Sequence, residues 1–249
     1  MKRGSHMSVA IFAMVAMLGL SASARAAGGV IEINQAVVNA AGGFPYNISA
    51  NGSYRLSGNL TVSSTTADAI VIGSSVNNVT IDLNGFSITG PGGANTGNGI
   101  HQLGFGLLTV ENGSITGFSG GGSSGNGVTT FSNAIVRNMQ VSGNDVGIDV
   151  PSGVISGNTA NNNVIGIYCT SGGCVISGNT ANNNSSHGIN YNGSGSVITG
   201  NTALTNGGIG LLGGDSTNAY GGNVMNGNGF KDVQGGTSLG NNLCSGTIC

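Results

Sequence analysis

One nine-residue segment recurs in this chain, and its spacing constrains the fold more than any other feature. ISGNTANNN occupies residues 155–163 and again 176–184, and a diverged copy, ITGNTALTN, occupies 198–206. Aligned on the asparagine of each SGN-like element, the series has steps of 20, 21, 22 and 22 residues: Asn138, Asn158, Asn179, Asn201 and Asn223. A nearly constant period of this length indicates a stack of small repeated units.

Two apolar columns follow the same period. Isoleucine recurs at Ile135, Ile155, Ile176 and Ile198. A glycine followed by an apolar residue recurs at Gly99-Ile100, Gly127-Val128, Gly147-Ile148, Gly166-Ile167, Gly188-Ile189, Gly208-Ile209 and Gly229-Phe230. Each repeat holds short alternating segments typical of strands, and none shows helical spacing. The repeat is too short for a propeller blade and lacks the leucine motif of leucine-rich repeats. We therefore predict an all-β, single-domain parallel β-helix of about 8–9 coils.

The polar letters of the repeat have a structural role in such a stack. The isoleucine of I-S-G-N points inward, the glycine permits a bend with positive φ, and the asparagine lies at the corner. Asparagines stacked from coil to coil can hydrogen-bond along the stack. We therefore predict a structural ladder formed by Asn138, Asn158, Asn179, Asn201 and Asn223.

The two ends of the chain differ from the repeats. Residues 1–27 combine Lys2 and Arg3, a short apolar run and an A-x-A site, as in a secretory signal peptide; an uncleaved anchor is the alternative. The letters GSHM at positions 4–7 resemble a cloning scar. Residues 28–58 are expected to hold a cap and the first strands, with a short helix between Asn34 and Gly42. Repeats fill 59–243, and 119–127 reads as a loop inserted in one coil.

The four cysteines form two close pairs, Cys169 with Cys174 and Cys244 with Cys249. Such pairs favour two local disulfides in an oxidising compartment over a metal site, which needs further ligands nearby. The second pair would close a C-terminal loop over 244–249. Together with the signal peptide, the pairs predict a secreted or periplasmic bacterial protein, without stable membrane insertion after cleavage.

Charge excludes one class of partner. Charged residues make up 6% of the chain, and cleavage after the A-x-A site would leave three cations against eight carboxylates, a net charge of −5. Nucleic-acid binding needs a basic surface, so we expect no nucleic-acid partner. The sequence indicates no oligomeric state.

Two outward columns carry groups capable of chemistry. With a one-residue shift between coils, Asp82, Glu111 and Arg137 fall on successive rungs and are the weak catalytic candidates; a charge ladder facing solvent is the alternative. Arg137 would keep both carboxylates ionised, which does not suit a general acid. The second column follows the glycine–apolar pairs and includes the substrate-binding candidates His101, Asp149, Tyr168 and Asn190, with Thr129, Gly210 and Lys231. An ordinary solvated sheet face is the alternative there.

The segments GSYRLSGNLTV (52–62) and VTIDLNGFSITG (79–90), followed by the ISGNTANNN repeats, resemble bacterial right-handed parallel β-helix repeat proteins of the pectate-lyase-like superfamily. The resemblance covers about residues 30–243 and implies a right-handed, exported solenoid. Many such proteins bind or cleave polysaccharides. Lyases among them use a carboxylate cluster that holds Ca²⁺, so calcium is the one cofactor the resemblance implies. The expected function is polysaccharide binding, with modification left open; a noncatalytic structural or adhesive envelope protein is the alternative.

Overall fold

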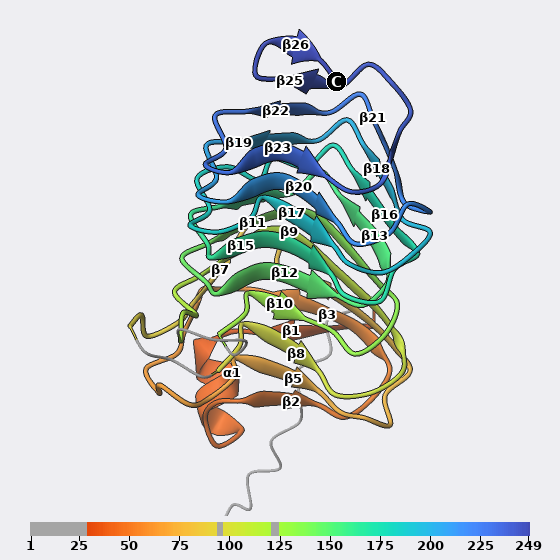
Figure 1. The fold of residues 1–249 in the computed structure, drawn as a ribbon. Coiled ribbons are helices and arrows are strands. Elements are labelled where there is room, and N and C mark those ends of the chain that lie inside the picture. The colour runs from red at the N-terminus through yellow and green to blue at the C-terminus, as the bar shows by residue number, and fades with distance from the viewer. Residues whose placement is uncertain (1–28, 94–96, 121–124) are drawn as a thin grey trace, which may run out of the picture.

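The computed structural model describes residues 29–93, 97–120 and 125–249. The predicted signal peptide and part of the predicted 119–127 loop lie outside these ranges. The described chain forms a parallel β-solenoid of nine coils, counted by one strand per coil in its nine-stranded sheet. The strands nearest the viewer in Figure 1 run to the right while the chain climbs from the N-terminal to the C-terminal end, so the solenoid is right-handed.

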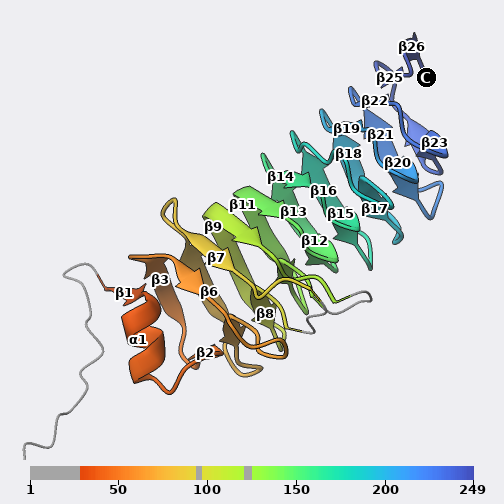
Figure 2. The same ribbon diagram turned by 90° about the vertical axis from the view of Figure 1, so that its left-hand side faces the viewer.

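Two long parallel sheets and a shorter third face enclose the core (Figures 1 and 2). Sheet B is the nine-stranded sheet, with the order β2 (Tyr46–Ile48), β5 (Ile70–Ile72), β8 (Ile100–Gln102), β10 (Val128–Thr129), β12 (Val146–Val150), β15 (Ile165–Cys169), β17 (Ile189–Tyr191), β20 (Ile209–Gly213) and β23 (Lys231–Gln234). Sheet A has the order β1 (Val30–Ile33), β3 (Gly52–Leu56), β6 (Asn78–Asp82), β9 (Leu107–Thr116), β11 (Ala134–Ser142), β13 (Gly153–Ser156), β16 (Cys174–Ser177), β18 (Val197–Thr199), β21 (Ala219–Gly221) and β24 (Thr237–Ser238).

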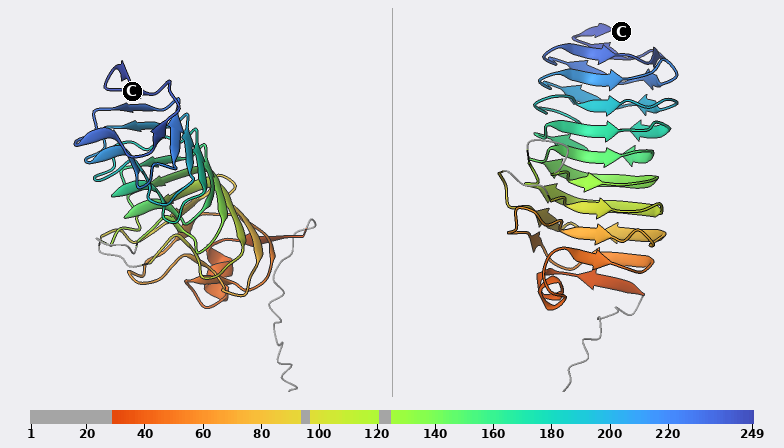
Figure 3. Two further views of the ribbon diagram at one scale, coloured as in Figure 1. Left: turned by 45° about the vertical axis from the view of Figure 1, so that its right-hand side comes forward. Right: turned by 60° about the horizontal axis from the view of Figure 1, so that its bottom comes forward.

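The third face follows sheet A after a sharp corner. Its strands are β4 (Leu60–Thr61), β7 (Ser87–Thr89), the second halves of β9 and β11, β14 (Thr159–Asn161), β19 (Thr202–Leu204), β22 (Val224–Asn226), β25 (Leu243–Cys244) and β26 (Thr247–Ile248). Two further views show the same stacking of coils (Figure 3).

The apolar alternation of the repeat fills the interior. Ile155, Ile176 and Ile198 pair in register on successive strands of sheet A, and all three are fully buried. Ile135 does not belong to this column, because it pairs with Val154 on the outer surface and is 41% exposed; Val136 takes the inward position. Burial of each inward aliphatic side chain contributes roughly 1.5–3 kcal/mol to the free energy of unfolding, so this column stabilises the contacts between the coils that carry it.

The predicted asparagine ladder lines the corner between sheet A and the third face. The side-chain oxygens of Asn179, Asn201, Asn223 and Asn242 each accept from the backbone N–H and the side-chain amide of the ladder asparagine one coil earlier, over 2.9–3.1 Å. Asn158, the first member, accepts from the backbone N–H of Met139. The ladder thus satisfies backbone donors that the bend leaves without strand partners.

Asn138 was predicted as a member of this ladder, and that prediction is wrong. It is exposed, has a φ of 54° and donates to Asn112 Oδ1, whereas Met139 occupies the inward position. In the coil that follows, Gly157 takes the left-handed conformation instead, with a φ of 65°. Because glycine adopts this conformation without strain, the next residue, Asn158, is free to point inward.

A second buried ladder, missed in the sequence analysis, lines the corner between the third face and sheet B. The ladder consists of Asn144, Asn163, Asn184, Asn206 and Asn228. The backbone N–H of each of the first four donates to the side-chain oxygen of the asparagine one coil later, over 2.9–3.1 Å. The side-chain amides of Asn163 and Asn184 also donate to the carbonyls of Val141 and Ala160. The final asparagine of each NTANNN segment therefore has a defined structural role.

The ends are closed differently. Helix α1 (Gln35–Ala40) begins at Asn34, whose side chain accepts from Val37 N, and it buries Val38 against the first coils. Both predicted cysteine pairs form disulfides: Cys169–Cys174 links sheet B to sheet A, and Cys244–Cys249 closes the β25–β26 hairpin at the C-terminal end. Among the residues described, no helix is long and apolar enough to cross a membrane.

Candidate functional site

The predicted charge column lies on the outer surface of sheet A. Asp82 pairs with Glu111 in strand register, and Glu111 pairs with Arg137, as the sequence predicts. The same register extends the column towards the N-terminus through Arg55 and Glu32. We define the charge column as Glu32, Arg55, Asp82, Glu111 and Arg137.

The column pairs its charges internally. Arg137 Nε and Nη2 both lie 2.6 Å from Glu111 Oε2, and Arg55 Nε lies 3.4 Å from Asp82 Oδ2. Asp82 Oδ1 also accepts from the backbone N–H of Asn84 at 2.8 Å. Asp82 and Glu111 therefore each have charged or hydrogen-bonding partners within the protein, so neither carboxyl group is free to contact a substrate as a proton donor in hydrolysis.

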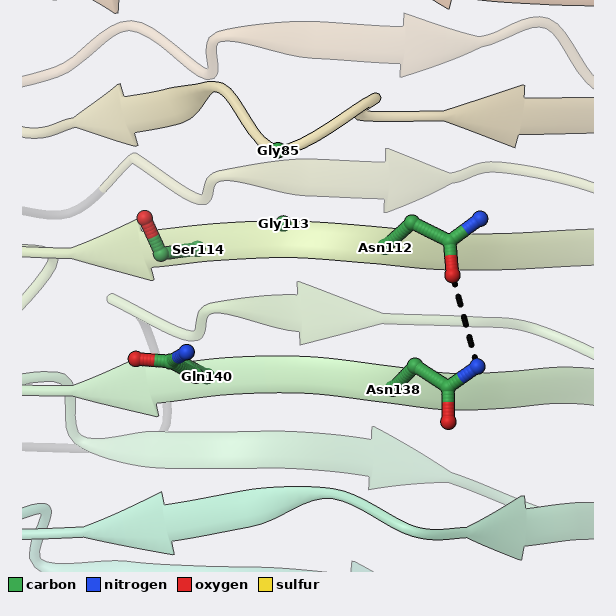
Figure 4. A pocket seen from close by; sticks show the side chains of 6 residues that line it. All are labelled: Gly85, Asn112, Gly113, Ser114, Asn138 and Gln140. Carbon is green, nitrogen blue, oxygen red and sulfur yellow. Dashed lines mark hydrogen bonds between the residues drawn. The ribbon is translucent and has the colours of Figure 1, made fainter.

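A polar hollow adjoins the column where sheet A turns into the third face. It has a volume of about 440 Å³ and is lined by Gly85, Asn112, Gly113, Ser114, Asn138 and Gln140. Figure 4 shows the amide and hydroxyl groups on two neighbouring coils, with Asn138 Nδ2 donating to Asn112 Oδ1 at 3.3 Å. Among the residues that the structure describes, the Ser114 hydroxyl and the Gln140 side-chain amide have no hydrogen-bond partner. Their donors and acceptors are available to a ligand.

The local sequence explains this hollow. Gly85 and Gly113 line the hollow with backbone alone; a Cβ on Gly85 would meet nothing within 4 Å, whereas one on Gly113 would point into the core, 2.3 Å from Cβ of the buried Leu83. Asn112 and Asn138 adopt left-handed conformations with φ of 61° and 54°, which turn their side chains outward. The coils that carry inward asparagines at this corner have glycine at the corresponding position instead, as at Gly157.

The second predicted column lies on sheet B. His101, Thr129, Asp149, Tyr168 and Asn190 occupy one register line on adjacent strands. We define these five residues as the polar column. Its predicted continuation through Gly210 and Lys231 is wrong, because Asn190 pairs with Leu212 and Leu212 with Gln234. The glycine–apolar pair of that coil is Gly210-Leu211; β20 begins two residues before the aligned position, which displaced the predicted register.

Most groups of the polar column have partners on neighbouring residues of the same face, but Asn190 Oδ1 is buried without a hydrogen-bond partner in the part of the chain described. Asn190 is only 6% exposed, and Tyr168 Oη accepts from Asn192 Nδ2 at 3.0 Å. His101 Nδ1 lies 2.9 Å from Asp68 Oδ2. Burial acts to raise the pKa of Asp68, but hydrogen bonds from His101 and Asn98 outweigh it and lower the pKa. Burial raises the pKa of Asp149 to about 6, against a hydrogen bond from Thr129.

Neither surface holds a constellation for metal-dependent chemistry. Within residues 29–93, 97–120 and 125–249, no three histidine, cysteine, aspartate or glutamate side chains come together as a metal site would require. A hard cation takes six or more oxygen ligands, and Asp82 and Glu111 are engaged with arginines. The residues present therefore do not fit a calcium site.

The sequence analysis missed the members of the hollow other than Asn138, and also the exposed Phe105 and Phe131. The NG dipeptides at 84–85 and 112–113 mark the turn positions that create the hollow, and this signal was available. Comparisons with protein-family models, with curated proteins and with solved structures find no match to this chain.

Proposed function

We propose that this chain is an exported β-solenoid protein that binds a polysaccharide on the outer face of sheet A, at the polar hollow beside the charge column. The observation that carries the proposal is the lining of the hollow, in which amides and a hydroxyl from neighbouring coils face outward over a glycine floor. The resemblance to β-helix repeat proteins and the two cysteine pairs support export.

The chemistry of the hollow suits sugar hydroxyls. Asparagine and glutamine side chains offer a donor and an acceptor side by side, and serine offers both in one group. A sugar ring presents the same alternation of donors and acceptors around its edge. A charged polymer is less well matched, because Arg137 and Arg55 are already paired with carboxylates. We therefore propose a neutral polysaccharide.

Binding is favoured over cleavage at this site. Glycoside hydrolysis needs one carboxyl group held protonated to donate to the leaving group. Asp82 and Glu111 are each paired with an arginine, so neither carboxyl group is free to contact a glycosidic oxygen. The alternative, a structural or adhesive envelope protein, is supported by the regularity of the two asparagine ladders and requires no bound glycan.

The test is a glycan microarray followed by calorimetric titration of the best neutral polysaccharide. Gln140→Ala and Asn138→Gly should each weaken binding about tenfold, which corresponds to about 1.4 kcal/mol for hydrogen bonds lost in the hollow. Gln234→Ala is the matched control, since this glutamine is exposed on β23, far along the solenoid, and affinity should not change. Glu111→Gln reports on the charge column by releasing Arg137. Unchanged affinity in the Gln140, Asn138 and Glu111 variants would refute the polar hollow as the binding site. No binding of any glycan would favour the structural or adhesive alternative.

Export is tested separately. Expression of the full chain in a Gram-negative host should yield periplasmic or secreted protein whose N-terminus follows Ala26 or Ala27. Retention of the intact N-terminus in the membrane fraction would support an uncleaved anchor instead.

A further inference from the structure

Two exposed phenylalanines lie side by side on neighbouring coils. The ring centroids of Phe105 and Phe131 are 4.8 Å apart with an interplanar angle of 75°, and the two residues are 74% and 52% exposed. The chain contains seven phenylalanines and no tryptophan, so this exposed pair accounts for two of its seven phenylalanines. An edge-to-face pair leaves ring surface open to a ligand.

The loops that carry the pair are fixed by the fold. Gln102 Nε2 donates to Gly106 O at 2.9 Å, Gly106 N donates to Ser132 Oγ at 3.0 Å, and the Ser132 hydroxyl donates to Gly106 O at 2.7 Å. Gly104 packs so closely on the preceding coil that a Cβ would come within 2.3 Å of Ser74 O. The rings are therefore presented outward by a braced turn.

The pair is continuous with the polar hollow across sheet A. β9 and β11 begin just after the two rings, and their outward side chains run from Leu107 and Ile135 to Glu111 and Arg137. A second hollow of about 300 Å³ includes Leu107, Ile135 and Val154 in its lining. Along the chain, Phe105 and Ser114 are separated by a contour length of about 30 Å at ~3.3 Å per residue, and the left-handed Asn112 bends this path between them.

We infer that an extended neutral polysaccharide crosses sheet A along β9 and β11, with its apolar ring faces on Phe105 and Phe131 and its hydroxyls in the polar hollow. The inference rests on the proposed function and specifies its ligand: a chain of pyranose units, each with an apolar face and a polar edge. The surface has the same division, because aromatic and aliphatic groups occupy one end of the two strands and amides the other.

A second copy of the chain fits this surface less well. An exposed apolar patch often marks a protein interface, and a stable one buries more than about 1,000 Å². Such an interface here would cover the half-exposed Arg137 and the hollow, whose polar groups would need partners on the other copy. A soluble sugar chain supplies hydroxyl partners at these positions.

The experiment titrates the full chain with cello-oligosaccharides from disaccharide to hexasaccharide, which have apolar ring faces and no charge. Affinity should rise with length up to the hexasaccharide. Phe105→Ala and Phe131→Ala should each weaken hexasaccharide binding about tenfold while leaving disaccharide binding in the hollow unchanged. Phe230→Ala is the matched control, because Phe230 is 69% exposed near the far end of the solenoid. Thermal melting verifies that the variants are folded.

The outcomes separate the two proposals. If hexasaccharide binding weakens in Gln140→Ala but not in the phenylalanine variants, the inferred path across sheet A is overturned and the proposed function still stands. Dissociation of a dimer in the Phe105 and Phe131 variants, measured by analytical ultracentrifugation, overturns the inference in favour of self-association. Absence of binding to cello-oligosaccharides, with a different neutral glycan bound at the hollow, overturns the ligand class assigned here; absence of binding to any glycan overturns both proposals.

Discussion

Replacing Asn179 by alanine removes one member of the buried ladder in the middle of the solenoid. Asn179 is 1% exposed, and its side-chain oxygen accepts from the backbone N–H and the side-chain amide of Asn158, each at 2.9 Å. Its own side-chain amide donates to Ile155 O at 2.9 Å and to Asn201 Oδ1 at 3.0 Å. The same amide also donates to Ser177 O at 3.2 Å, and alanine keeps the backbone but deletes all five interactions.

The magnitude follows from the groups left without partners. In the variant the buried Asn158 N–H has no acceptor, Asn158 Nδ2 loses one of its acceptors, and Ile155 O loses a donor. An unsatisfied buried polar group costs about 1–3 kcal/mol, so the expected loss in free energy of unfolding is about 3–6 kcal/mol. A solenoid is stabilised mainly by contacts between neighbouring coils, so the loss should concentrate in the adjacent coils.

Two measurements check this expectation. Denaturant unfolding gives the global change, and amide hydrogen exchange should show faster exchange at Asn158 and in the neighbouring coils. Asn138→Gly is the matched control, since it removes an exposed asparagine side chain at a left-handed position that glycine adopts without strain, and stability should change little. A loss below about 1 kcal/mol in Asn179→Ala, with Asn158 exchange unchanged, would refute the role assigned to the ladder.

Three further perturbations have defined outcomes. Cys169→Ala with Cys174→Ala should lower the free energy of unfolding by about 2 kcal/mol for so short a loop, and a reductant should then change the melting temperature less than in the parent chain. Asp149→Asn should stabilise the fold at neutral pH by at most about 3 kcal/mol. Because burial raises the folded pKa of Asp149 to about 6, the parent chain loses stability as the pH rises from the unfolded pKa near 4 to the folded pKa near 6. Melting is measured across this pH window for both proteins. A difference in melting temperature between parent and variant that stays constant over the window would contradict the raised pKa. Arg137→Ala should cost about 1–2 kcal/mol, because Arg137 is half-exposed whereas Glu111 is only 15% exposed and loses its partner. The difference in melting temperature should shrink with added salt; a larger, salt-independent loss would indicate a packing role.

The fold could be predicted because the solenoid brings identical letters into contact. Ile155, Ile176 and Ile198 stack because parallel strands in register place equivalent positions above one another. The same logic placed Asp82, Glu111 and Arg137 on successive rungs. It failed where a coil departs from the consensus: at Asn138 the asparagine itself adopts the left-handed conformation, and the inward position moves on by one residue.

The candidate site was less accessible from the sequence. The polar hollow depends on which asparagines turn outward, and Asn112 and Asn158 differ in this respect although both sit at the same corner. The exposure of Phe105 and Phe131 depends on loops braced by Gln102 and Ser132, which lie outside the repeated letters. Neither property has a period, so neither can be read from spacing.

The spacing of the repeat by itself determined the coil, the strand order and the core-facing residues of the regular coils, since each coil pairs only with its neighbours and repeats their pattern; it misplaced Ile135, which lies on the outer surface. The tertiary structure alone decided which polar groups reach solvent and which are used within the stack. That choice depends on single backbone torsions at the corners and on contacts across coils, because a rotation at one residue turns the next side chain from the interior to the surface.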